Sequence, residues 1–328
     1  MNRKKFFIIA LIAFACIVAL VALIALSKSG KKGGKFSVVT TIFPIYDWAR
    51  EVGSGNGNIE YTMLLNNGAD LHSFQPSVKD IAKVSSADIF IYVGGESDEW
   101  VEDVLRTVKN KNLKAINLMD ALESRILEEE LVEGMQAEEE EDGEEADEEE
   151  VEYDEHIWLS LKNAALCVEE ISRAFISSDE SNSSLYSSNA SAYSSKLSDL
   201  EKQYSSACAG AKNKTLVFAD RFPFRYMIQD YGLDYYAAFS GCSAETEASF
   251  QTVKFLVDKI DELDLDNVFV IESSDKKLAK TIIENSKRHD RNILVLDSMQ
   301  SISKKDVEGG KTYLGIMQSN LDQLKKGL

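Results

Sequence analysis

Residues 63–100, MLLNNGADLHSFQPSVKDIAKVSSADIFIYVGGESDEW, contain the pattern that decides the fold. An apolar run at 61–65 predicts a strand, and the Asn-Asn-Gly signal that follows predicts the turn that ends it. A helix is expected next, with Pro76 near its start and Ser73 as its cap, and then a second strand at 89–93. Strand, loop, helix and strand in this order predict a parallel βαβ unit of an α/β protein.

His72 lies in the loop after the first of these strands and is one of only 3 histidines in the chain. Ligands bind at the carboxyl ends of parallel strands, so the position suits a ligand-binding residue. A single loop histidine is nevertheless more often a solvated or structural side chain. Its role can be inferred only if a partner is found elsewhere in the sequence.

The composition is that of a globular protein with one unusual segment. The 328 residues suffice for two domains, and 44% of them are hydrophobic. The formal net charge is −19, but residues 128–155 hold 18 acidic and no basic residues, which leaves 37 acidic against 36 basic residues elsewhere. Segment 128–154 is therefore predicted to be a disordered insert, either solubilising or collecting divalent cations loosely. No basic stripe points to a nucleic-acid partner.

Residues 1–35 predict export. Asn-Arg-Lys-Lys precedes the uncharged apolar run 6–26, and a Gly- and Lys-rich tether follows at 27–35. A cleaved signal peptide, a lipoprotein signal at Cys16 and an uncleaved membrane anchor are three competing interpretations, and the anchor fits the length of the run best. Because lysines flank both ends of the run, the positive-inside rule does not decide its orientation. Each of them predicts an extracytoplasmic protein, membrane-anchored at the cell surface or secreted.

The other three cysteines, Cys167, Cys208 and Cys242, have no CxxC spacing. They predict neither a zinc knuckle nor a disulfide framework, although one bridge among them stays open.

A second histidine motif follows the acidic segment. Residues 153–164, YDEHIWLSLKNA, place His156 between acidic residues and an Ile-Trp-Leu-Ser run at the start of a helix. Together with GADLHSFQPS at 68–77, this motif resembles those of the metal-binding solute receptors of zinc and manganese ABC importers. The resemblance covers residues 36–328 apart from the acidic insert. It implies that His72 and His156 are the first and second ligands of a divalent metal ion.

The same resemblance implies two Rossmann-like lobes with parallel sheets, joined by one long helix. The N-terminal lobe is expected at 36–176, the linking helix at 177–212 and the C-terminal lobe at 213–328. Apolar residues in the linking segment recur at helical spacing, although its many serines lower helix propensity, so packing must support the helix.

Arg221 marks the main departure from the family pattern. It stands where the family usually has a His or Glu ligand, and a guanidinium stays protonated and cannot bind a cation. Asp220, at the same strand end, could supply an oxygen instead. Alternatively the position is empty or taken by water, and Arg221 pairs with an acidic neighbour. Repulsion between Arg221 and a dication favours Asp220 as the ligand. Asp297, which follows the strand expected at 292–296, falls where the family places its last carboxylate ligand.

The resemblance thus predicts an exported monomeric receptor that binds Zn²⁺, or alternatively Mn²⁺, between its lobes and delivers it to an ABC permease. The expected ligands are His72, His156, Asp297 and Asp220. A site with two imidazoles favours zinc. No enzymatic activity is expected, since a metal-dependent hydrolase would need a water-activating site and the sequence has neither HExxH nor a nucleophile elbow. A surface interaction protein with a metal site weakened by Arg221 is the other alternative.

Overall fold

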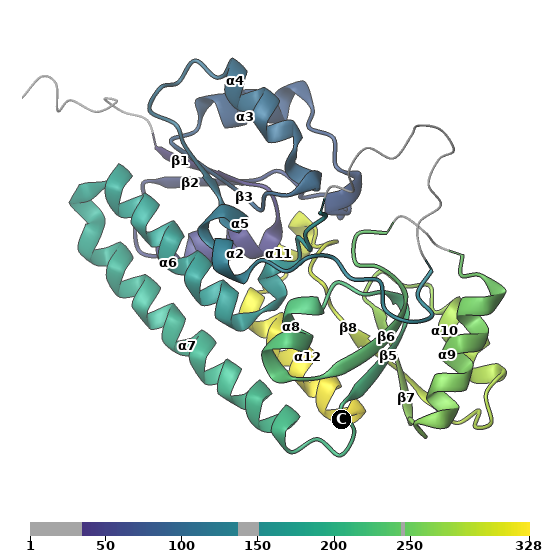
Figure 1. Ribbon diagram of the computed structural model, residues 1–328. Helices are drawn as coiled ribbons and strands as arrows, with labels where there is room; N and C mark the ends of the chain where they lie inside the picture. The colour runs from purple at the N-terminus through teal and green to yellow at the C-terminus, as the bar shows by residue number, and fades with distance from the viewer. Residues whose placement is uncertain (1–34, 137–150, 244–246) are drawn as a thin grey trace, which may run out of the picture. The chain divides into compact units, whose positions relative to one another are not determined.

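The computed structural model describes residues 35–136, 151–243 and 247–328 (Figure 1). The predicted signal or anchor segment, with Cys16, and residues 137–150 of the predicted insert lie outside the described residues. None of the helices in the described ranges is both long and apolar enough to cross a membrane.

The N-terminal lobe is built on a four-stranded sheet with the order β2-β1-β3-β4. Strand β3 runs parallel to β1 and to β4, with Val38 opposite Ile89 and Ile91 opposite Ile116. The elements are β1 (Phe36–Thr40), α2 (Phe43–Val52), β2 (Ile59–Met63), α3 (Val78–Ser86), β3 (Ile89–Tyr92), α4 (Trp100–Thr107), β4 (Lys114–Asn117) and α5 (Leu118–Ala121). The predicted succession of strand, His-bearing loop, helix and strand is confirmed.

The start of α3 differs from the expectation. Ser77, not Ser73, is the N-cap: its hydroxyl accepts from the Asp80 backbone N–H while the Asp80 carboxylate accepts from the Ser77 backbone, which is a capping box. Ser73 instead ends a short 3-10 helix, Leu71–Ser73, that Asp70 caps. This extra turn holds His72 in a fixed backbone conformation.

The C-terminal lobe repeats the architecture with the order β6-β5-β7-β8. Its strands pair in parallel as β5 with β6, β5 with β7 and β7 with β8. The elements are β5 (Thr215–Arg221), α8 (Arg225–Tyr231), β6 (Asp234–Phe239), α9 (Phe250–Glu262), β7 (Asn267–Ile271), α10 (Lys277–Glu284), β8 (Asn292–Leu296) and α11 (Lys304–Glu308). In both lobes the strand order reverses beside the first strand, and ligands bind at the carboxyl ends of strands near such a point.

Helix α6 (Leu161–Ser178) is followed by the 27-residue α7 (Ser183–Ala209), which lies along both lobes (Figure 1). The buried residues of α7 recur every three or four positions, from Tyr186 to Cys208, and its serines occupy mainly the remaining positions. Packing on one face therefore supports a helix that composition alone would not favour. The predicted segment 177–212 contains the end of α6 and all of α7, separated where the Asp179 carboxylate accepts hydrogen bonds from Asn182 and Tyr186.

A buried junction connects the lobes beside the site. The Trp158 indole N–H donates to the Ser298 carbonyl at 2.8 Å. Tyr313, the first residue of α12 (Tyr313–Gly327), donates its hydroxyl to the Trp158 carbonyl at 2.6 Å and its backbone N–H to Asp47 at 2.8 Å. Since these groups are buried, the loops around them are held firmly.

Both ends of the acidic segment differ from the predicted disorder at 128–154. The Glu129 backbone N–H donates to the Glu152 carbonyl at 2.9 Å, and the Gln136 N–H donates to the Ala238 carbonyl at 2.9 Å. For Gln136 the physical reason is that β6 is an edge strand, whose carbonyl groups offer partners to a neighbouring chain segment. Residues 128–136 thus run from the N-terminal lobe to the end of β6.

Candidate metal centre

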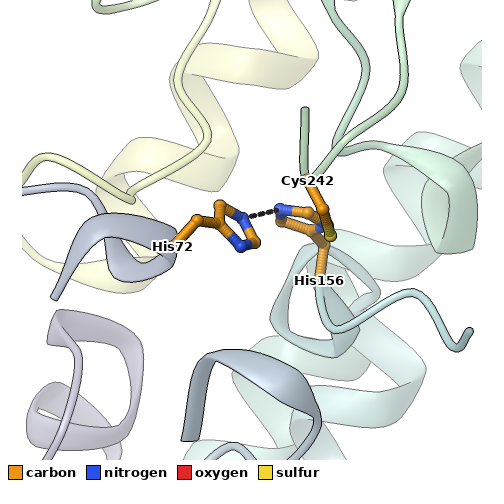
Figure 2. Close-up of side chains that lie close together, drawn as sticks. All are labelled: His72, His156 and Cys242. Atoms are coloured by element: carbon orange, nitrogen blue, oxygen red, sulfur yellow. Dashed lines mark hydrogen bonds between the residues drawn. The ribbon is translucent and has the colours of Figure 1, made fainter. Parts of the chain in front are cut away.

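The side chains of His72 and His156 point toward one another (Figure 2). His72 lies in the 3-10 helix after β2, and His156 immediately precedes a second short 3-10 helix, Ile157–Leu159. Their Nε2 atoms are 3.2 Å apart. His156 is fully buried, and the side chain of His72 is 14% exposed. The structure therefore brings together the two histidines that the sequence singled out.

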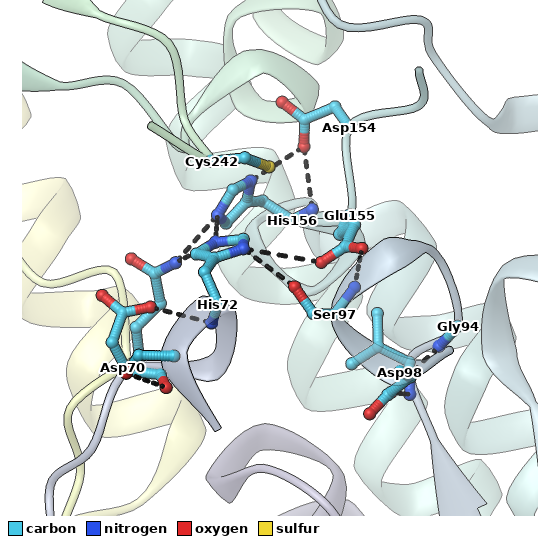
Figure 3. Close-up of polar contacts among 12 residues, drawn as sticks. Asp70, His72, Gly94, Ser97, Asp98, Asp154, Glu155, His156 and Cys242 are labelled. Atoms are coloured by element: carbon cyan, nitrogen blue, oxygen red, sulfur yellow. Dashed lines mark hydrogen bonds and ion pairs between the residues drawn. The ribbon is translucent and has the colours of Figure 1, made fainter. Parts of the chain in front are cut away.

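Hydrogen bonds on the opposite ring nitrogens orient both imidazoles (Figure 3). His156 Nδ1 lies 3.0 Å from Asp154 Oδ1, and His72 Nδ1 lies 2.9 Å from Ser97 Oγ and 3.7 Å from Glu155 Oε2. A carboxylate can only accept, so the network assigns the proton of neutral His156 to Nδ1, and the same assignment suits His72. Both Nε2 lone pairs then face the same point, as in metal sites where an outer carboxylate fixes the tautomer.

Gln300 lies at that point. Its amide Nε2 is 3.0 Å from His72 Nε2 and 2.9 Å from His156 Nε2, and its Oε1 accepts from the Ser298 hydroxyl at 3.0 Å. The amide N–H groups thus satisfy two lone pairs that would otherwise repel each other. If the amide turned by half a rotation, Oε1 would face the same point as a neutral oxygen donor.

The groups around the two imidazoles favour a nearby cation but disfavour protonation of both rings at once. Burial, followed by the charge of His156, lowers the pKa of His72 to about 3. Burial also opposes a charge on His156, but the Asp154 carboxylate outweighs it and raises the pKa of that imidazole. The pair therefore resists double protonation, while the carboxylates of Asp154, Glu155 and Glu129 favour positive charge nearby.

Cys242 is the third member of the cluster and was not predicted. It lies in the loop after β6, and its Sγ and the ligand nitrogens of His72 and His156 all lie within 4.8 Å of one another. The described cysteines, 167, 208 and 242, are all free thiols. Burial, followed by the charge of Glu129, raises the pKa of the Cys242 thiol. No spacing rule in the sequence could identify this residue, because its partners are 86 and 170 positions away.

Asp297 and Asp220 are placed differently from the expectation. Within the described ranges, one group of three His, Cys, Asp or Glu side chains has mutually close ligand atoms, and it consists of His72, His156 and Cys242. Asp297 Oδ1 accepts from the Met299 backbone N–H at 2.9 Å, and Asp220 Oδ1 accepts from the Arg221 backbone N–H at 2.9 Å. The Asp297 carboxylate is thus turned back onto its own loop, Asp220 is also hydrogen-bonded to Ser274, and neither carboxylate joins the two histidines.

Arg221 pairs with an acidic neighbour, as one of the predicted alternatives required. Its Nη2 donates to Asp70 Oδ2 at 2.6 Å and its Nη1 to the Ser243 carbonyl at 3.3 Å. Burial opposes the charge of Asp70, but the Arg221 guanidinium holds the pKa of that carboxyl below its usual range. Asp70 also accepts from the His72 backbone N–H, so the ion pair links the end of β5 to the His72 loop. The guanidinium charge is therefore compensated beside the imidazoles.

A cavity of about 840 Å³ opens beside this cluster. It is lined by residues of both lobes, including Asp70, His72, Arg221, Cys242, Ser274 and Lys277. His72 and Cys242 are thus reached from the same space.

The fold and the site define a class: a two-lobed α/β protein with doubly wound lobes and a paired-imidazole site near their strand ends. The family model described as zinc-uptake complex component A periplasmic matches residues 38–327. The chain belongs to this family, which confirms the predicted resemblance.

Two relatives illustrate the relationship. Zinc-binding lipoprotein AdcA of Streptococcus pneumoniae strain R6 is 30% identical over 294 residues, which are 89% of this chain and 56% of the relative. The chain thus spans about half the length of that relative. High-affinity zinc uptake system protein ZnuA of Bacillus subtilis is 29% identical over 294 residues, covering 90% of this chain and 88% of the relative.

Solved structures agree with the fold. The zinc-bound ZnuA-like domain of S. pneumoniae AdcA matches with a TM-score of 0.70 and 27% identity, covering 90% of this chain and 99% of that chain. A laminin-binding adhesin of Streptococcus agalactiae matches with a TM-score of 0.72 and 24% identity over 89% of this chain and 99% of that chain, a likeness of fold alone. The predicted α/β architecture of two parallel-sheet lobes is confirmed.

Proposed function

We propose that the chain is an extracytoplasmic receptor that binds one Zn²⁺ ion as cargo between its lobes and delivers it to the permease of an ABC importer. The family, the zinc-binding relatives and the imidazole pair support this proposal. Residues 1–35 would attach the receptor to the membrane, and it would act as a monomer.

The observation that carries the proposal is the pair of Nε2 atoms 3.2 Å apart with both Nδ1 atoms engaged. Zn–N bonds of about 2.0–2.1 Å in a tetrahedral site place two imidazole nitrogens about 3.3–3.4 Å apart. The imidazoles therefore already have nearly the separation that zinc requires. Gln300 would move aside or bind through Oε1, and neither Asp220 nor Asp297 is needed.

Zinc is favoured over manganese by the donor types at this point. Imidazole nitrogen suits zinc, whereas manganese prefers several carboxylate, carbonyl or water oxygens. The nearest carboxylates, Asp154 and Glu155, are engaged with His156 and Ser97 and act as orienting groups. The hydrogen bonds that His156 makes to Asp154 speak against Asp154 as the general base of the hydrolase alternative, because this carboxylate is already engaged.

A metal titration of the full-length chain tests the proposal. After removal of metal with a chelator, zinc and manganese are titrated side by side against a competing indicator. We expect one tight zinc ion per chain and weaker manganese binding, with loss of tight binding in His72→Ala and in His156→Ala.

His289→Ala is the matched control, because His289 is the third histidine of the chain and is exposed. Tight zinc binding that survives both site substitutions would overturn the proposal. Absence of tight binding from the unmodified chain would instead favour the surface interaction protein.

A further inference from the structure

The loop that carries Cys242 is built against the face of His156. Gly241 precedes Cys242, and a Cβ atom at Gly241 would lie 2.9 Å from His156 Cε1 and 3.0 Å from the Phe222 carbonyl oxygen. Only glycine fits between a fully buried ring and a backbone carbonyl at this separation. The sequence of the loop therefore allows the Cys242 backbone to approach the imidazole pair closely.

A second contact holds the loop from the opposite direction. The Cys242 backbone N–H donates to Glu129 Oε1 at 3.4 Å, and residues 128–136 are joined in turn to the end of β6. Cys242 is thus fixed between its own strand and the segment from the N-terminal lobe. Figure 2 shows the three side chains meeting from separate loops.

Resting on the proposed zinc receptor function, we infer that Cys242 binds the ion through its thiolate and makes the site selective for zinc over manganese. The ligand atoms of His72, His156 and Cys242 lie within 4.8 Å of one another. Bonds of about 2.3 Å to sulfur and 2.0–2.1 Å to nitrogen place tetrahedral ligand atoms about 3.4–3.6 Å apart. A rotation of the Cys242 side chain that moves Sγ by about 1 Å would bring the three ligand atoms to these distances.

The chemistry of the step is a simple exchange. The Sγ–H bond of Cys242 gives its proton to water as the Zn–S bond forms, and the imidazole nitrogens bind through their free lone pairs. The thiolate is a soft ligand that stabilises zinc and adds little for manganese, which prefers oxygen. Because Cys242 and His72 line the same cavity, an arriving ion meets both side chains together.

Cobalt substitution provides a direct test. The full-length chain is stripped of metal and loaded with Co²⁺, which takes zinc-like tetrahedral sites and gives an intense near-ultraviolet charge-transfer band only when a thiolate is bound. We expect this band in the unmodified chain and its loss in Cys242→Ser, while visible Co²⁺ bands persist through the two imidazoles. Cys208→Ala, which alters a buried thiol on α7, is the matched control and should keep the band.

Competition titrations test the selectivity. Cys242→Ser should weaken zinc binding by roughly tenfold or more and leave manganese binding within about twofold of its original value. Cobalt bound without a charge-transfer band in the unmodified chain would overturn the role of Cys242 and leave the receptor function standing, and that result needs no variant to fold. No binding of either cobalt or zinc would overturn the receptor function and this inference together.

Discussion

Replacing Asp154 by asparagine removes the charge that orients His156 and nearly preserves the shape of the side chain. Asp154 Oδ1 accepts from the His156 backbone N–H at 2.8 Å and lies 3.0 Å from Nδ1, and the carboxylate is only 2% exposed. The asparagine oxygen can accept the same two bonds. A hydrogen bond to a charged group contributes about 1–2 kcal/mol more than a neutral one, so zinc binding should weaken roughly 5–30-fold.

The pH dependence of binding gives a second readout of the same substitution. Burial lowers the pKa of His156, but the Asp154 charge raises it overall. Without that charge the pKa of His156 falls, and protons compete less with zinc for the imidazole. The acid limb of the affinity curve should therefore move to lower pH in Asp154→Asn, although the affinity at higher pH is weaker.

Competition titrations with zinc from about pH 5 to 8, the range in which histidine titrates, measure both effects. Asp179→Asn is the matched control, because Asp179 accepts side-chain hydrogen bonds between α6 and α7 and takes no part in the imidazole network. An Asp154→Asn variant that folds normally and binds zinc as tightly as the unmodified chain would refute the view that this carboxylate orients a ligand.

Two further substitutions and a pair of deletions have defined expected results. Burial raises the pKa of Asp47 from 3.8, its value in the unfolded chain, to about 6. The protonated carboxyl therefore makes its full contribution to stability below pH 3.8, and this contribution is lost as pH rises through 6. Between pH 4 and pH 7, the free energy of unfolding of Asp47→Asn should therefore rise by up to about 3 kcal/mol relative to that of the unmodified chain, as measured by urea unfolding. The same difference in free energy of unfolding at both pH values would contradict this. Gly241→Ala should lower stability by about 1–3 kcal/mol and weaken zinc binding, as unfolding and titration would show. Deleting 137–150 should leave the tight zinc site unchanged in titrations, whereas deleting 128–152 should weaken it because Glu129 is lost.

The parts of the fold that local sequence dictates could be predicted. The βαβ unit, the loop position of His72 and the motif around His156 all rest on residues that are neighbours in the chain. The main error in this stretch, Ser73 as helix cap, arose because Ser77 and Asp80 form a better cap four residues later. Such errors move a boundary and leave the topology unchanged.

The remaining members of the site depend on backbone conformation and packing that the sequence does not reveal. Met299 has a φ of 62°, in the left-handed region that a methionine rarely adopts. This turn directs Gln300 toward the imidazoles and leaves the Asp297 carboxylate to accept from the Met299 N–H. Cys242 reaches the same point because Gly241, in the loop after β6, packs closely on His156.

The hydrogen bond from Trp158 to Ser298 has a consequence for the residence time of a bound ion. Trp158 lies two residues after His156, and Ser298 lies two residues before Gln300, so the two loops cannot separate while this buried bond is intact. Leaving one buried donor or acceptor without a partner costs about 1–3 kcal/mol, which would slow escape roughly 5–150-fold. The cross-lobe bond therefore acts on the rate of release more than on equilibrium affinity, and under the proposed function an ion would stay bound between encounters with the permease.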